Sequence, residues 1–160
     1  MPPTATAGYS YKPQSITAKR TDDVTAAAEL VAQVVSVQES QAEREIDETK
    51  FIGLDAAVNR PMGKSATDLE LSLKALSPAF LTMCQESWDS SAVTLTIVLI
   101  SEGINYAAVA PDIVLKTTTY IGWVSGKLVP TAIAAGDVEE YAVKLQLIAE
   151  PVVLITGGPA

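Results

Sequence analysis

The sequence predicts a mainly β protein, a β-sandwich or barrel with one flanking α-helix. Several segments alternate apolar and polar residues, which is the pattern of strands that bury one face. A single segment, after Ser77, has instead the start signal and the residue spacing of a helix. Because one helix lies among many strands, we expect strands to form the core layers and the helix to cover one flank or end.

Composition limits the class of protein and its chemistry. Of the 160 residues, 48% are hydrophobic and 19% are charged, which argues against disorder. No apolar run approaches the roughly 20 residues of a membrane helix, and no signal peptide is predicted. There is no histidine, and Cys84 is the single cysteine, so Ser–His and Cys–His catalysis within one chain is excluded. We therefore expect no enzyme activity, no cofactor and no metal, and we expect Cys84 to be a small buried hydrophobe on the helix.

Residues 1–25 are expected to form an N-terminal arm. Pro2, Pro3 and Pro13 interrupt regular structure, and the small polar residues between them offer little to bury. Such an arm is normally disordered unless neighbouring copies hold it.

A β domain is expected over residues 26–156, with a short tail over 157–160. Its first segment, 26–38, mixes helix-favouring Ala, Glu and Gln with strand-favouring Val. We favour a strand over a helix there. The residues that would share one face of this strand are Val31, Gln33, Val35 and Val37.

A short strand over 46–51 is expected to lead into a long loop. Residues 53–65 are interpreted as a loop or an extended hairpin tip, because Asn59, Pro61 and Gly63 are turn residues. After it, leucines alternate with polar residues over 68–74, which predicts a strand.

The helix is expected to start with Ser77 as its N-cap and Pro78 at its first position, and to continue over 79–85. Its apolar face would consist of Phe80, Met83 and Cys84. Further strands are predicted over 92–101, 113–124, 139–148 and 152–156.

Other patterns indicate structure rather than a binding site. Gly63-Lys64-Ser65 matches the end of a phosphate-binding loop. This motif also needs a glycine five residues before Gly63, and Val58 occupies that position. Adjacent carboxylates such as Asp47-Glu48 point to opposite faces of a strand, so they do not converge. Trp88 and Trp123 have few basic residues near them in sequence, so packing at a sheet edge or between subunits is favoured over stacking on bases or sugars.

Three features together resemble the tail-tube proteins of long-tailed bacteriophages. Residues 45–51 resemble the acidic-Thr-aromatic strand start that precedes the long loop of these subunits. Residues 77–87 resemble their single helix. The segment 120–126, followed by 136–141, is similar to their closing hairpin. The resemblance spans about residues 26–156.

The resemblance implies a structural protein. Tail-tube subunits form hexameric rings whose inner sheets join into a continuous barrel, and the rings stack into a tube. The tube encloses the tape-measure protein and later guides double-stranded DNA to the host without binding it specifically. The implied partners are other copies of this chain, the tape-measure protein and tail-end proteins, with no membrane. The implied location is the virion tail, assembled in the host cytoplasm. Contractile tails and type VI secretion tubes share the fold, and the expected arm favours a long, non-contractile tail.

Within this hypothesis, the loop over 53–65 is predicted to reach the adjacent ring, because loops of this length are usually functional or disordered. The predicted inter-ring contact residues are Asn59, Arg60, Pro61, Met62 and Lys64. Met62 would enter an apolar contact, and Arg60 or Lys64 would pair with a carboxylate there.

The net charge of −8 argues against strong binding to phosphate backbones. We expect a lumen lined by acidic and small polar residues, past which DNA can move. The alternative hypothesis is a β-sandwich binding module that does not polymerise, such as a capsid decoration protein.

Overall fold

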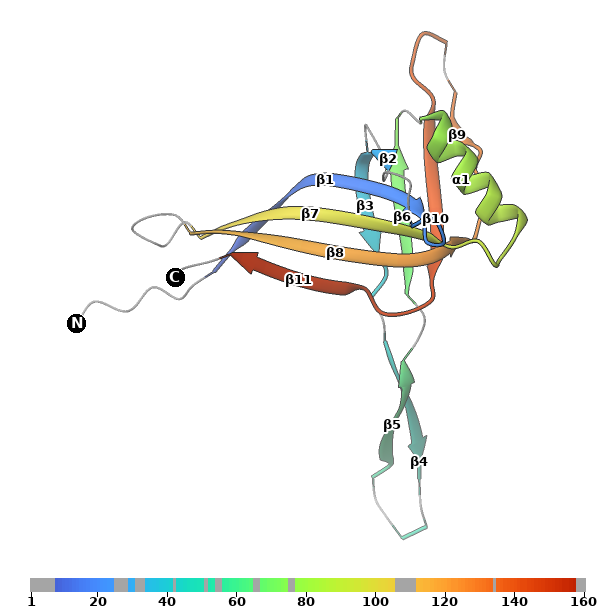
Figure 1. Ribbon diagram of the computed structural model, residues 1–160. Coiled ribbons are helices and arrows are strands. Elements are labelled where there is room, and N and C mark those ends of the chain that lie inside the picture. Colours follow the sequence, from blue (N-terminus) through green and yellow to red (C-terminus); the bar gives the residue numbers. More distant parts are fainter. Residues whose placement is uncertain are drawn as a thin grey trace, which may run out of the picture.

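The computed structural model describes residues 8–24, 29–30, 34–41, 43–50, 52–53, 56–64, 67–74, 77–105, 112–133 and 135–157 (Figure 1). The helix of this part is α1 (Pro78–Asp89). Its strands are β1 (Ser10–Arg20), β2 (Glu29–Leu30), β3 (Val34–Glu39), β4 (Arg44–Thr49), β5 (Val58–Lys64), β6 (Asp68–Leu73), β7 (Leu95–Asn105), β8 (Asp112–Val124), β9 (Pro130–Ala132), β10 (Glu140–Leu147) and β11 (Val152–Gly157). The predicted mainly β fold with one flanking helix is confirmed. No helix in the described ranges is long and apolar enough to cross a membrane.

One antiparallel sheet of nine strands forms the body of the protein. Its strand order is β2-β1-β7-β8-β10-β6-β3, with β11 added to β8 and β9 added to β10. Strand β8 joins two halves, because residues 114–119 pair with β11 whereas Gly122–Val124 pair with β10. We call β1, β7, β8 and β11 the long-strand half, and β3, β6, β9 and β10 the short-strand half. The long strands cross the short ones steeply, so that the sheet folds over its own core (Figure 1).

The hydrophobic core lies between the two halves and α1. The long-strand half contributes Ile16, Ala18, Leu95, Ile97, Tyr120 and Val124. The short-strand half contributes Leu69, Leu71, Leu73, Val143, Leu145 and Leu147, and α1 contributes Phe80 and Cys84. Period-two alternation therefore identified the buried faces of β6 and β10 correctly. Full burial of each Leu, Ile, Val or Phe contributes roughly 1.5–3 kcal/mol to stability.

The two halves meet at a glycine. Gly122 of β8 lies opposite Leu147 of β10, where a Cβ atom would lie only 2.4 Å from the carbonyl oxygen of Gln146. The absence of a side chain lets the two backbones approach closely at the fold of the sheet.

Helix α1 starts as the sequence predicts. The side chain of Ser77 accepts a hydrogen bond from the backbone N–H of Phe80 at 3.1 Å, and Pro78 follows at the first helical position. Phe80 and Cys84 are buried, as expected, and the helix continues beyond residue 85 to Asp89.

The expectation of an arm without regular structure over 1–25 is wrong where the structure describes it. Residues Ser10–Arg20 form β1, which pairs with β7 along its length. Two features accommodate Pro13 in this strand. The pairing register with β7 shifts between Pro13 and Ser15. In addition, β2 pairs only with Thr17 and Ala18, so the part of β1 that contains Pro13 lies at the sheet edge. Residues 1–7 lie outside the described part.

The strand interpretation of 26–38 is confirmed over Glu29–Leu30 and from Val34 onward, but the predicted face is not. A register shift between Val34 and Ser36 turns Val34 and Val37 towards the core and leaves Val35 61% exposed. Val31 and Gln33 lie outside the described residues.

The segment 53–65 contains a strand rather than a plain loop. Strand β5 pairs with β4 to form an antiparallel hairpin that projects from the body (Figure 1). The predicted turn residues Asn59, Pro61 and Gly63 lie within β5, so the turn assignment is wrong, whereas the extended hairpin is correct. Pro61 is tolerated because each strand of a two-stranded hairpin has a free edge that needs no N–H donor.

Candidate assembly surfaces

Strand β11 is an unprotected sheet edge. It pairs with β8 on one side, and no other described strand pairs with it. Four consecutive apolar side chains, Val152, Val153, Leu154 and Ile155, are each more than half exposed. The strand contains no charged residue and no proline, which are the usual protections of a free edge. Such a strand is suited to pair with another chain.

The opposite edge of the long-strand half is the first part of β1. Over Ser10–Ser15 this strand pairs with β7, and β2 covers only Thr17 and Ala18. The ring of Tyr11 lies against Gly103, where a Cβ atom would be 2.6 Å from the ring. The ammonium group of Lys116 lies 4.3 Å from the centre of the same ring, a cation–π contact. These contacts order the strand while its outer edge has no described partner strand.

All five predicted inter-ring residues lie on β5 and are exposed: Asn59, Arg60, Pro61, Met62 and Lys64. The structure places them together on one strand of the projecting hairpin, where the sequence predicted a loop or an extended hairpin tip. Arg60 lies opposite Asp47 in the hairpin register. Lys64 donates to Glu150 of its own chain at 2.8 Å, and this contact lowers the pKa of the Glu150 carboxyl. Lys64 thus already has a carboxylate partner at the base of the hairpin.

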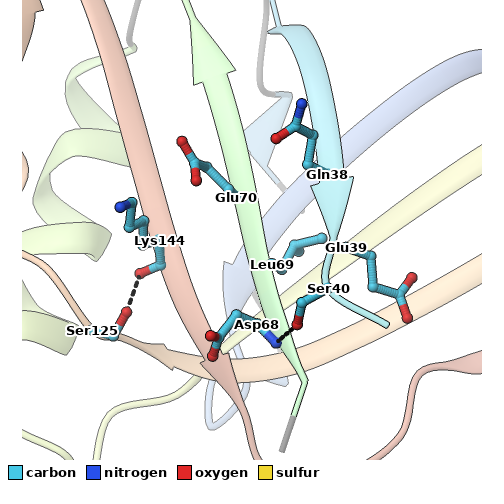
Figure 2. Close-up of a pocket in the computed structure, with 8 residues that line it drawn as sticks. All are labelled: Gln38, Glu39, Ser40, Asp68, Leu69, Glu70, Ser125 and Lys144. Carbon is cyan, nitrogen blue, oxygen red and sulfur yellow. Dashed lines mark hydrogen bonds between the residues drawn. The ribbon is translucent and has the colours of Figure 1, made fainter. Parts of the chain in front are cut away.

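A polar groove of about 310 Å³ lies beside the base of the hairpin (Figure 2). Its lining includes Glu39, Asp68, Glu70 and Lys144. Glu39 accepts a hydrogen bond from the phenol of Tyr120 at 3.2 Å, and burial together with this carboxylate raises the pKa of Tyr120 to about 12. No group of residues that could hold a metal ion occurs in the described ranges. We interpret the groove as a solvated polar surface.

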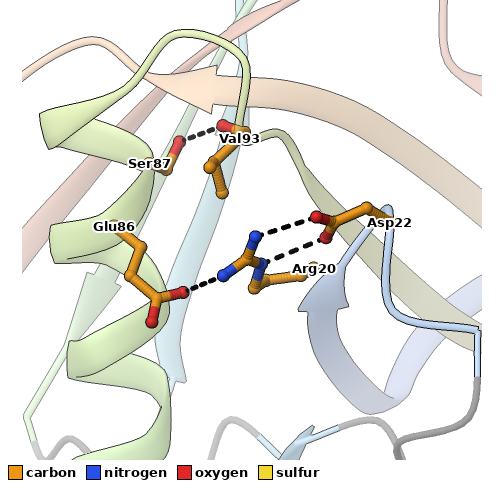
Figure 3. A network of polar contacts seen from close by, with 5 residues as sticks. All are labelled: Arg20, Asp22, Glu86, Ser87 and Val93. Carbon is orange, nitrogen blue, oxygen red and sulfur yellow. Dashed lines mark hydrogen bonds and ion pairs between the residues drawn. The ribbon is translucent and has the colours of Figure 1, made fainter.

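An ion-pair network fixes α1 to the end of β1 (Figure 3). The guanidinium of Arg20 donates two hydrogen bonds to Asp22 and one, at 2.6 Å, to Glu86 on the helix. The bonds to Asp22 and then to Glu86 raise the pKa of Arg20. The carboxylates of Asp22 and Glu86 are thereby engaged in holding the helix to the strand.

The long-strand half has an open face opposite the core, and this face is not acidic. Strand alternation places threonines and apolar residues there, among them Thr17, Val98, Ile100, Thr117, Thr119 and Leu154. Its charged residues in the described strands are Lys12, Lys19 and Glu102. Small polar residues are thus present on this face, and acidic residues are few.

The remaining candidate residues have structural positions. Cys84 is buried, and burial raises the pKa of its thiol to about 12. Trp88 is 44% exposed on α1, and Trp123 is half-buried on β8. Gly63 and Lys64 lie in a hairpin strand instead of a loop before a helix, so the phosphate-binding interpretation fails.

Comparison with solved structures identifies the fold. The protein resembles the SPP1 tail tube, with a TM-score of 0.58 and 10% sequence identity over 89% of this chain and 76% of that chain. This chain has a tail-tube fold. The protein also resembles a chain of the anti-feeding prophage baseplate in its six-fold symmetrised structure. The TM-score is 0.52, and the sequence identity is 12% over 97% of each chain. No family model and no curated protein matches the sequence.

The resemblance inferred from the sequence is thus confirmed at the level of the fold. Sequence reasoning missed the free edge of β1, because Pro13 and the polar residues of this segment concealed a strand. The sequence predicted strand β11, but it did not predict that both faces of this strand are exposed. That exposure depends on the position of β11 in the sheet. The available signal was the charge-free run over 152–157.

Proposed function

We propose that this chain is a tail-tube subunit whose copies close into hexameric rings and stack into a conduit for double-stranded DNA. The observation that carries this proposal is the pair of free edges on the long-strand half. One edge is the apolar strand β11, and the other is Ser10–Ser15 of β1. Edges of this kind are a liability in a monomer and a bonding surface in an assembly.

Strand directions support closure into a ring. Each neighbouring pair in the order β1, β7, β8 and β11 is antiparallel, so β1 and β11 run in opposite directions. When β11 of one copy lies beside β1 of an equally oriented copy, the new pair is again antiparallel. Repetition of this heterologous contact closes a ring if the rotation per copy permits it. The open face of the long strands then lines the lumen.

The stacking contact is assigned to the β4–β5 hairpin. Deletion of residues 59–64 is expected to remove β5 and leave ring formation intact, while it abolishes the stacking of rings. The tape-measure protein inside the tube and tail-end proteins at its ends are the further proposed partners, and assembly would take place in the host cytoplasm. DNA would pass without specific binding, because the lumen face offers few cations to phosphate.

Electron microscopy of the purified protein tests the proposal. The wild-type chain is expected to form rings or tubes. V153K/L154K places one charge on each face of β11 and is expected to leave folded monomers, because a charged edge resists pairing. L81K/Q85K adds the same charge at two exposed positions on α1, away from this edge, and is expected to assemble. A wild-type chain that stays monomeric at high micromolar concentration in every salt would refute the proposal and favour a non-polymerising binding module.

A further inference from the structure

Strands β3 and β6 connect two opposite ends of the molecule. At one end, Glu39 and Asp68 mark the base of the projecting hairpin. At the other end, Val35 near the start of β3 lies beside Leu73 at the end of β6. Figure 1 shows the hairpin and the connection between β9 and β10 projecting in opposite directions from the body. A contact between these two ends repeats by translation and builds a stack.

The second end contains a hollow of about 90 Å³. Its lining residues include Val35, Leu73, Thr131, Tyr141 and Ala142. Lys74 and Glu140 also line it, and the Lys74 ammonium lies 3.9 Å from a carboxylate oxygen of Glu140. Ile133 and Val138, both well exposed, lie close by in sequence on either side of the turn after β9. The hollow is therefore lined by both apolar and polar side chains, and Val35 at its border is 61% exposed in the described part of the chain.

The hairpin is the complementary shape at the first end. Strands β4 and β5 pair with each other and belong to a separate sheet from the body. An isolated two-stranded hairpin is marginally stable in water, so this one gains from a surface that covers it. Met62 is 52% exposed near its middle, and the flexible methionine side chain fits irregular hollows well.

Charge disfavours contact between two equal hollow ends. The end with the hollow carries Asp137, Glu139 and Glu140 against Lys74, so two such ends repel each other. The strands of the hairpin are neutral overall, because Arg44, Arg60 and Lys64 balance Glu45, Asp47 and Glu48. The hairpin can therefore approach the acidic end without this repulsion, which favours head-to-tail stacking.

We propose that Met62 of one copy seats in the hollow beside Val35 and Tyr141 of the copy in the next ring. This inference rests on the proposed tube function and names the surface that receives the hairpin. It places the stacking contact on the short-strand half, whereas the ring contact lies on the long-strand half. Ring closure and stacking are then separable by mutation.

Disulfide trapping tests the contact directly. M62C/V35C is expected to form a ladder of covalent oligomers under mild oxidation in assembled tubes. The native Cys84 does not interfere, because it is 1% exposed. M62C/L81C is the matched control, since Leu81 is similarly exposed but lies on α1, and it is expected to give no ladder. Tubes that form normally while M62C/V35C stays uncrosslinked would overturn the inference.

Mixing two stacking-deficient variants gives a second, independent test. M62D has a defective hairpin and an intact hollow, and V35D has the reverse. Each variant alone is expected to form single rings, because both positions are exposed and outside the ring contact. A mixture of preformed rings of the two variants is expected to yield stacks of two rings, because one intact hairpin meets one intact hollow. Normal tubes from V35D alone would refute this receiving surface, whereas a wild-type chain without any rings would refute the proposed function itself.

Discussion

The buried hydroxyl of Ser87 on α1 accepts a hydrogen bond from the backbone N–H of Val124 on β8 at 2.9 Å. The same hydroxyl donates to the carbonyl of Val93 at 2.8 Å. Ser87 is 2% exposed, so water cannot replace it. This side chain connects the helix, the turn after it and the strand that joins the two halves of the sheet.

Replacement of Ser87 by alanine is expected to lower the free energy of unfolding by about 1–3 kcal/mol, because a buried N–H and a carbonyl lose their partner. Ser125→Ala is the control, since the exposed Ser125 hydroxyl makes only a 3.3 Å bond to the carbonyl of Lys144. It should change stability by less than about 0.5 kcal/mol. Denaturant titrations of the two variants compare these values, and equal stabilities would contradict the role of Ser87.

Gly122→Ala is expected to be among the most destabilising single substitutions in the chain. The new Cβ would lie 2.4 Å from the carbonyl oxygen of Gln146 and 3.1 Å from the Cα of Leu147, and backbone atoms cannot move aside as a side chain does. We expect a loss of about 3 kcal/mol, at the upper end of overpacking effects. Gly126→Ala, which meets no atom within 4 Å, should be nearly neutral. Thermal unfolding of both variants measures the difference, and a stable Gly122→Ala protein would show that the two strands can separate at this point.

The sequence allowed prediction of the strands that bury one face and not of those held by their edges. The leucines of β6 alternate because one side of that strand lies in the core. Strand β1 has a proline, Pro13, and an exposed first half, and the order of that half comes from its pairing with β7, which leaves no periodic signal in the sequence. Strand β5 buries neither face, so nothing in its composition separates it from a loop. The hollow combines Val35, Leu73 and Tyr141, which only the sheet order brings together.

The stability of the protein is expected to fall in alkaline solution through Tyr120. Its pKa is raised from 10.0 to about 12, first by burial and then by the charge and hydrogen bond of Glu39. Between these values the folded chain holds a proton that the unfolded chain has lost, so the free energy of unfolding decreases as pH rises from 10 to 12. Below pH 10 this contribution is fully retained.

Tyr120→Phe should therefore lose stability less steeply over this range than the wild type. Tyr11→Phe, at a residue 36% exposed, is the control and should keep the wild-type slope. Urea midpoints between pH 9 and 11.5 measure the slopes. Parallel curves for wild type and Tyr120→Phe would show that the phenol of Tyr120 does not control the alkaline loss.

Assembled tubes of the wild-type chain are expected to show no measurable duplex affinity at physiological salt. The open face of the long strands carries Lys12 and Lys19 against Glu102, and the whole chain has a net charge of −8. We therefore attribute the expected weak DNA binding to the small number of cationic side chains on this face, and not to repulsion by acidic side chains. Because DNA binding depends on cations that displace counterions, added lysines on this face should create affinity.

T117K/T119K places two lysines per copy on the open face and is expected to bind duplex DNA in a salt-dependent manner. The logarithm of its binding constant should fall with the logarithm of salt concentration by roughly 0.9 per phosphate contact. L81K/Q85K places the same added charge at two exposed positions on α1, outside the long strands, and should bind duplex DNA less than T117K/T119K when DNA ends can enter the tube. Gel-shift and fluorescence anisotropy titrations at several salt concentrations compare the three proteins. Nanomolar duplex binding by the wild type, or equal binding by the two lysine variants, would contradict the assignment of this face to the lumen.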